Sequence, residues 1–187
     1  MKQNFETEFD SYMQVLREQM YEKYNRVLPS GELIFNRFDK ARFLNCGEKS
    51  SVYDSSVVLG DVKIGSNVWV GPYTLLDGSG GTLSIEDFVS IAAGTMIYTH
   101  DSSKYYVSGG KAAFEKGEVT IKNNSVIGTM CVIKHGITIG KHCIVGAQSF
   151  VTKDVPDYSI VAGVPATIIG KVVLEEEGVH FEYFGQK

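Results

Sequence analysis

Residues 121–151 read IKNNSVIGTMCVIKHGITIGKHCIVGAQSFV, and an aliphatic side chain returns at every sixth position of this stretch. The six positions are Ile121, Ile127, Ile133, Ile139, Val145 and Val151. The same period runs upstream in two blocks separated by a slip of three residues: Val52, Val58, Ile64, Val70 and Leu76, and then Ile85, Ile91 and Ile97. These fourteen hexads indicate a repeat architecture.

The other positions of the hexad are nearly as regular. The residue directly after the aliphatic one is often glycine, as at Gly65, Gly128 and Gly140. The fourth residue after the aliphatic one is mostly small or β-branched. Glycine suits a sharp corner because it lacks a side chain that would clash. Each hexad thus predicts one short strand and one corner, and stacking buries each aliphatic side chain on its equivalent in the next coil. We predict a parallel β-helix and not a β-sandwich, whose strands would alternate with period two.

Length and composition bound the class of protein. The chain has 187 residues, 43% of them hydrophobic, so we expect about one domain with a real core. The net charge of −4 argues against a nucleic-acid-binding protein. We find no apolar run that would span a bilayer, and the acidic start MKQNFETEFD lacks the layout of a secretion signal, so we expect a cytoplasmic protein. Three cysteines without CxxC spacing predict neither a disulfide framework nor a zinc knuckle.

The pattern divides the chain into three regions: 1–50 as a helical cap and lead-in, 51–155 as the β-helix, and 156–187 as a tail. Apolar side chains at spacings of three and four over 5–27 predict a helix. We expect this helix to cover the open end of the β-helix, the alternative being a partner-binding helix. Residues 102–118 interrupt the hexads with two adjacent glycines and an aromatic pair, which predicts an excursion loop of the kind that usually carries function.

His100 ends the second repeat block directly before this loop, where a cleft between loop and column would form. Imidazole suits a general base because its ordinary pKa lies near neutral pH. The alternative is a purely structural histidine. His135 and His142 fall at outward-facing positions and are interpreted as surface residues, and His180 receives no role.

Residues 139–167, IGKHCIVGAQSFVTKDVPDYSIVAGVPAT, carry the most specific signal in the chain. With the hexads, this stretch resembles the closing signature of the acetyl-CoA-dependent hexapeptide-repeat acetyltransferases. The resemblance implies a left-handed column, acetyl-CoA as acyl donor and no metal. It also implies a homotrimer whose active sites lie between subunits.

Carried over by position, the resemblance implies five coenzyme-binding residues. Thr152 and Lys153 match coenzyme contacts, Ala147 matches a residue that lines the pantetheine channel, and Thr129 matches one whose backbone amide lies near the thioester. Lys171 lies beside a position where the family often has a basic residue. Residues 121–171 independently hold five lysines against two acids, a local charge of +3 that would suit the coenzyme's phosphates.

The resemblance also implies the reaction. His100 matches the catalytic histidine, which would deprotonate a hydroxyl or amine so that it attacks the thioester directly. Asp77 matches an acidic contact to the acceptor, although it is equally a turn former beside Gly78. Tyr105, Tyr106 and Phe114 offer stacking surfaces for a sugar ring.

Several functions stay open at this point. The similarity favours acetylation of a sugar, in surface polysaccharide biosynthesis, over a xenobiotic acceptor such as chloramphenicol or a streptogramin. A metal-binding γ-carbonic-anhydrase-like protein or a scaffold β-helix is the alternative of another class, although we find no convincing set of three His or Cys ligands. Val126, His135 and Gln148 depart from the family's usual Trp, Pro and Gly.

Overall fold

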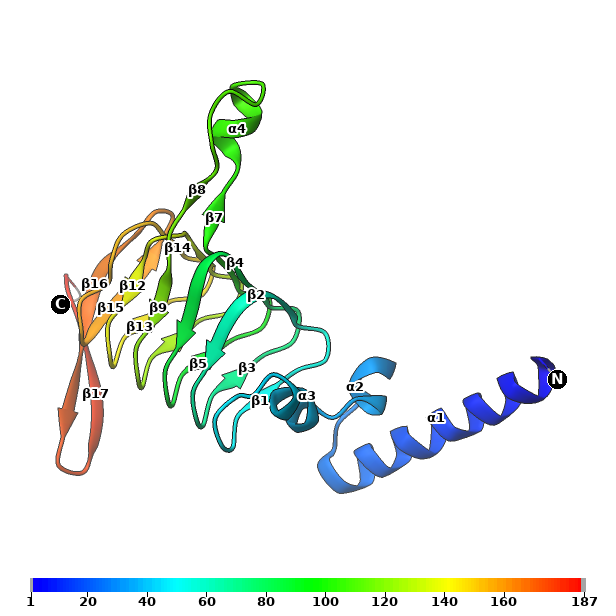
Figure 1. Ribbon diagram of the computed structural model, residues 1–187. Helices are drawn as coiled ribbons and strands as arrows, with labels where there is room; N and C mark the ends of the chain where they lie inside the picture. The colour runs from blue at the N-terminus through cyan, green and yellow to red at the C-terminus, as the bar shows by residue number, and fades with distance from the viewer. Residues whose placement is uncertain (1, 186–187) are drawn as a thin grey trace.

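The chain folds into a column of stacked coils, with a stalk projecting from its side and helices at its N-terminal end (Figure 1). This computed structural model describes residues 2–185. One sheet runs in the order β1 (Ser51–Val52), β3 (Trp69–Val70), β5 (Ser90–Ile91), β10 (Val126–Ile127), β13 (Ile144–Val145), β15 (Ser159–Gly163), β16 (Ala166–Glu175) and β17 (Gly178–Tyr183). The second runs β12 (Thr138–Ile139), β9 (Val119–Ile121), β4 (Leu75–Ile85), β6 (Met96–Tyr98), β11 (Val132–Ile133) and β14 (Phe150–Val151), with β2 (Val57–Ile64) beside β4.

The strand register confirms the predicted parallel stacking. Val52 pairs with Val70, and Ile127 pairs with Val145, so each coil consumes three hexads. The slip of three residues is absorbed inside β4, where the register with β2 shifts. The repeated aliphatic side chains form the core of the column, most of them fully buried, and Cys131 and Cys143 are buried with them as small residues.

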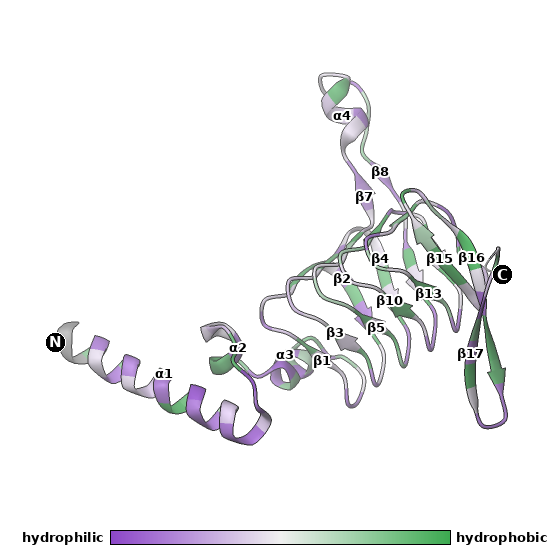
Figure 2. Ribbon diagram, turned by 180° about the vertical axis from the view of Figure 1, so that it is seen from behind, coloured by the Kyte–Doolittle hydropathy of each residue, from purple (hydrophilic) through white to green (hydrophobic). Residues whose placement is uncertain are grey.

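The N-terminal helices lie differently from the prediction. The predicted helix forms as α1 (Lys2–Tyr24), but it extends away from the column and does not cover its end (Figures 1 and 2). The expectation for α1 was therefore wrong. Its apolar side chains are largely exposed, as Phe5 is at 68%, whereas the shorter α3 (Arg37–Phe43) lies against β1 and buries Ala41 in the core of the column.

Polar contacts tie the helical region to the first coil. Lys40, on α3, donates from Nζ to the carbonyl oxygens of Tyr53, Asp54 and Ser56 at 2.6–3.1 Å. Glu32, on α2 (Ser30–Ile34), accepts from the backbone amides of Asp54 and Ser55. Burial lowers the pKa of Lys40, an effect that the nearby carboxylates partly offset. The corner around residues 53–56 is thus fixed by groups that precede the repeat.

The predicted excursion is an ordered stalk, defined here as residues 100–117. Its base is a two-stranded antiparallel ribbon, β7 (His100–Asp101) and β8 (Glu115–Lys116), and its tip carries the short helix α4 (Ser103–Val107) (Figure 1). Ile97 before the stalk pairs with Ile133 after it, so the column resumes its register beyond the excursion.

The C-terminal region continues the column further than its sequence pattern indicates. β15 still lies parallel to β13, with Val145 opposite Val161, after a step of 16 residues instead of 18. The chain then turns back through β16 and ends in the β16–β17 hairpin, which projects beyond the column (Figure 1). Among the described helices, none combines the length and apolar character that a membrane span requires.

Candidate active site

A buried carboxylate lies against the imidazole of His100. Asp77 Oδ2 is 3.3 Å from His100 Nδ1, and the Asp77 side chain is only 5% exposed. The alignment falls short of a hydrogen bond, so Nδ1 has no hydrogen-bond partner among the described residues. Asp77 Oδ1 accepts from the backbone amide of Ser79, and the Asp77 carbonyl oxygen accepts from the amide and hydroxyl of Thr99. Three hydrogen bonds, from Ser79 and Thr99, therefore hold Asp77 in place.

The three extra residues of the repeat fall between Leu76 and Ile85, and this segment packs against the residues that carry the imidazole. Gly80 donates from its backbone amide to Thr99 Oγ1 at 2.9 Å. A Cβ atom at Gly80 would lie 2.7 Å from His100 Cβ and closer still to the Thr99 carbonyl oxygen. Only glycine fits there without displacing its neighbours, so the irregular segment supports the histidine.

His100 opens onto a cleft of ≈ 450 Å³ at the base of the stalk. The corners that follow β6, β11 and β14 form one edge of the column because these strands are neighbours in one sheet. The cleft is lined by Tyr98, His100, Asp101, Ser102, Val132, Lys134, His135, Phe150 and Thr152. His100, the predicted general base, and Thr152, a predicted coenzyme contact, thus line the same cleft. The structure also places His135 in the cleft, half-buried and with Nε2 buried, so the interpretation of His135 as a plain surface residue was wrong.

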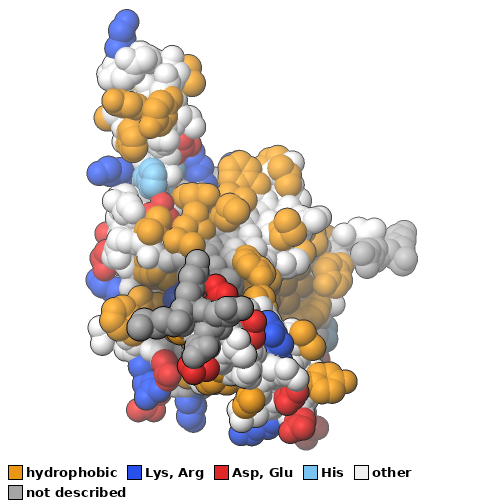
Figure 3. All heavy atoms as spheres, turned by 90° about the vertical axis from the view of Figure 1, so that its right-hand side faces the viewer, with side chains coloured by type: hydrophobic (Ala, Val, Ile, Leu, Met, Phe, Trp, Pro, Cys, Tyr) orange, Lys and Arg blue, Asp and Glu red, His pale blue; other side chains and the backbone are white. Residues whose placement is uncertain are grey.

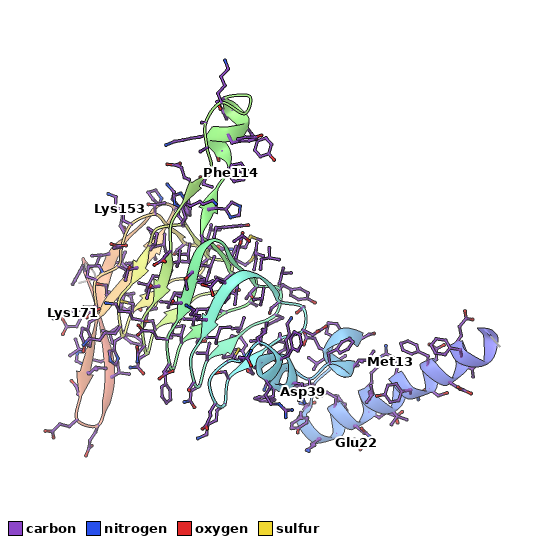
Figure 4. All side chains as sticks on the ribbon, viewed as in Figure 1. Met13, Glu22, Asp39, Phe114, Lys153 and Lys171 are labelled. Carbon is purple, nitrogen blue, oxygen red and sulfur yellow. The ribbon has the colours of Figure 1, made fainter. Side chains whose placement is uncertain are left out.

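Aromatic side chains of the stalk extend the site outward. Phe114 stacks on the His100 ring at 6.1 Å and meets Tyr105 edge-on at 5.1 Å. Tyr106 lies beside Tyr105 and Phe114, and it is 71% exposed. In Figure 3 a histidine lies at the foot of the stalk, below apolar side chains on its upper part, and Figure 4 marks Phe114 on the stalk. The predicted acceptor-stacking residues are therefore close to the imidazole.

The remaining predicted coenzyme residues do not line this cleft. Thr129 and Ala147 follow β10 and β13, at the corner on the opposite side of the β11–β14 face from His100. Thr129 is exposed, and no hydrogen bond from its backbone amide is found among the described residues. Lys153 lies at the stalk side of the column, and Lys171 lies on β16, where it forms an ion pair with Glu182 at 2.9 Å (Figure 4). A single chain therefore does not bring all the predicted coenzyme-binding residues to the cleft beside His100.

The stacked hexads and their cleft define a hexapeptide-repeat β-helix protein. Residues 118–153 match the family described as bacterial transferase hexapeptide (six repeats). Galactoside O-acetyltransferase of Escherichia coli K12 is 30% identical over 125 residues, 63% of this chain and 61% of that protein. A chloramphenicol acetyltransferase of Klebsiella aerogenes is 44% identical over 66 residues, 35% of this chain and 31% of that protein. The chain thus spans less than two thirds of these relatives.

Solved structures agree with the repeat. A mutant of AntD, an N-acyltransferase from Bacillus cereus in complex with dTDP-4-amino-4,6-dideoxyglucose and coenzyme A, matches with a TM-score of 0.61 and 29% identity, over 70% of this chain and 73% of that one. The hexapeptide-repeat acetyltransferase VCA0836 of Vibrio cholerae, in complex with acetyl-CoA, matches with a TM-score of 0.53 and 26% identity, over 84% and 87%. The repeat matched over residues 118–153 and these acetyltransferase relatives support the hexapeptide-repeat acetyltransferase family for this chain.

Proposed function

We propose that this protein transfers the acetyl group of acetyl-CoA to a hydroxyl or amine of a sugar. The observation that carries the proposal is the Asp77-backed imidazole of His100 at the mouth of the cleft. A galactoside O-acetyltransferase is among the relatives, and the similar solved structures hold coenzyme A with a nucleotide-linked amino sugar or acetyl-CoA. Donor and acceptor classes follow from these similarities.

The geometry supports a direct transfer with His100 as general base. The Asp77 carboxylate favours a proton on Nδ1 of His100, which leaves Nε2 as the basic nitrogen. Nε2 takes the proton from the hydroxyl or amine of the sugar while the oxygen or nitrogen of that group attacks the thioester carbonyl. The tetrahedral intermediate then collapses with cleavage of the carbon–sulfur bond, and the imidazolium returns the proton to the departing thiolate.

An oxyanion donor completes the proposed reaction. The free backbone amide of Thr129 is the candidate, but it lies across a column face from His100 of the same chain. We therefore propose that a neighbouring subunit supplies Thr129, together with Ala147, in a homotrimer of left-handed columns. Light scattering is expected to give about 62 kDa, three times the chain mass of 20.6 kDa, and a monomer would contradict the arrangement.

The stalk supports a ring-shaped acceptor. Tyr105, Tyr106 and Phe114 present apolar faces next to His100, which suits the carbon face of a sugar. We place this sugar in surface polysaccharide biosynthesis, and the protein in the cytoplasm, where acetyl-CoA is available. A xenobiotic acceptor is the second candidate, favoured by the 44% identity to a chloramphenicol acetyltransferase over the matched segment.

The decisive experiment measures thiol release from acetyl-CoA with a panel of free sugars, nucleotide sugars and antibiotics. We expect turnover with a sugar or nucleotide sugar, and turnover confined to an antibiotic would favour the second candidate. Calorimetric titration with acetyl-CoA separates both from a scaffold or hydratase. Failure to bind acetyl-CoA would overturn the proposed function.

A further inference from the structure

Two carboxylates oppose each other at the base of the stalk. Asp101 on β7 is the cross-strand partner of Glu115 on β8. Like charges directly opposite each other destabilise an antiparallel pair, because no intervening group separates them. The base of the ribbon therefore concentrates negative charge, which Lys104 and Lys134 offset in part.

A third donor approaches the same point from the column. His135, in the turn that follows β11, places a ring nitrogen so that donor atoms of Asp101, Glu115 and His135 all lie within 4.8 Å of one another. His135 Nε2 is buried and lacks a hydrogen-bond partner among the described residues. A buried ring nitrogen without a partner is costly, so this atom favours a ligand.

The protein's own contacts leave part of this donor set available. Lys104 pairs with Glu115 Oε1 at 2.8 Å, but its side chain is 64% exposed, and pairs of this kind contribute little. Asp101 Oδ1 accepts from the backbone amide of Ser103 at 2.7 Å. Asp101 also receives the Ser103 hydroxyl, whereas Glu115 Oε2 forms no hydrogen bond or ion pair among the described residues, so the two carboxylates keep lone pairs for a cation.

We propose that Asp101, Glu115 and His135 bind one divalent transition-metal cation, with Zn²⁺ as the fitting example. One imidazole and two carboxylates are ligands that Zn²⁺ accepts, with a fourth position left for water. The cation would join both strands of the stalk to the column, next to His100, which precedes Asp101. Its role is structural, and neither the proposal nor its test depends on acetyl transfer.

The test uses the full-length protein dialysed against EDTA and titrated calorimetrically with ZnCl₂. We expect one Zn²⁺ per chain, and we expect His135→Gln and Asp101→Asn each to weaken binding by about tenfold or more, because each removes one of three protein ligands. His142→Gln is the matched control. Its ring stacks on Tyr158 at 5.0 Å, away from the cleft, and its affinity should equal that of the wild type.

Circular dichroism of each variant establishes that the fold is retained. Absence of Zn²⁺ binding to the wild-type protein would overturn the proposal. Unchanged affinity in both folded ligand variants would overturn it as well. A loss of binding in His180→Gln alone would place the cation instead on the C-terminal hairpin, where Glu175 and Glu182 flank that histidine. Acetyl-CoA titration of the same samples reports separately on the proposed function.

Discussion

The carboxylate of Asp77 lies 3.3 Å from the imidazole of His100, although Asp77 is on β4 of the column and His100 is on β7 at the base of the stalk. Asp77 is opposite Tyr98 in the parallel register, and His100 follows two residues later. The pair is therefore a product of coil stacking and not of local sequence. Its position favours a role for Asp77 in orienting His100, and the contact of Asp77 to the acceptor stays a prediction.

His100→Ala should lower kcat by about 10²-fold or more, because it removes the proposed general base. The Kd for acetyl-CoA should stay nearly unchanged, because His100 is not among the predicted coenzyme contacts. Steady-state thiol release and calorimetry measure the two quantities. Retention of most of the activity would exclude the assignment.

Asp77→Asn should lower kcat by about tenfold or more without changing the Kd for acetyl-CoA. The amide keeps the shape of the side chain but loses the charge that orients and supports the imidazole. Thiol-release kinetics and calorimetry of the variant check both quantities, and an unchanged kcat would contradict the role of Asp77 in orienting His100. Asp61→Asn, which alters an exposed carboxylate bonded to Thr82, is the control and should behave as wild type.

Gly80→Ala should reduce kcat while the column stays folded. The added methyl group would lie 2.7 Å from His100 Cβ and would displace the imidazole from Asp77. Gly81→Ala is the matched control, because its nearest neighbour would be the Glu118 amide at 3.2 Å. Activity and thermal unfolding of both variants check the prediction, and equal activity would show that the histidine does not depend on Gly80.

Tyr106→Ala should raise KM for the acceptor by about twofold to tenfold, the range expected for loss of one aromatic contact. Its effect on kcat should be smaller, because Tyr106 reaches His100 only through Phe114. Val107→Ala removes another exposed side chain of the same helix and should leave KM unchanged. A parallel loss in both variants would indicate a general disturbance of the stalk.

The thiols of Cys131 and Cys143 should react slowly with Ellman's reagent in the native protein. Both are buried, and burial raises their pKa, so the reactive thiolate is scarce near neutral pH. The rate should increase as the pH approaches these raised pKa values, and unfolding in guanidinium should expose all three cysteines. Fast reaction of all three in the native state would contradict the core position of the two.

The hexad period was sufficient to predict the stacked column, because one aliphatic position per strand fixes both the buried face and the register. Ile127 and Val145, for example, pair as that period requires. The direction of α1 was not predictable, because its apolar spacing indicates a helix but not what it contacts. The continuation of the column to Val161 was also missed, since the last step has 16 residues and breaks the period.

The candidate site was predictable only in part. The position of His100 before an excursion singled it out. Its contact with Asp77 depends on how β4 and β6 stack, and the support from Gly80 depends on a slip that looks like an irregularity in the sequence. His135 was misinterpreted because outward-facing corners are usually solvated, whereas here the stalk covers one.

The pairing of Ile97 with Ile133 means that the polypeptide leaves and re-enters the column at matching levels. The ladder of backbone hydrogen bonds in the column therefore does not depend on the length of the stalk or on the side chains at its tip. Exchange of the stalk between its two strands, residues 102–114, would change the surface beside the cleft while His100 and Asp77 keep their geometry.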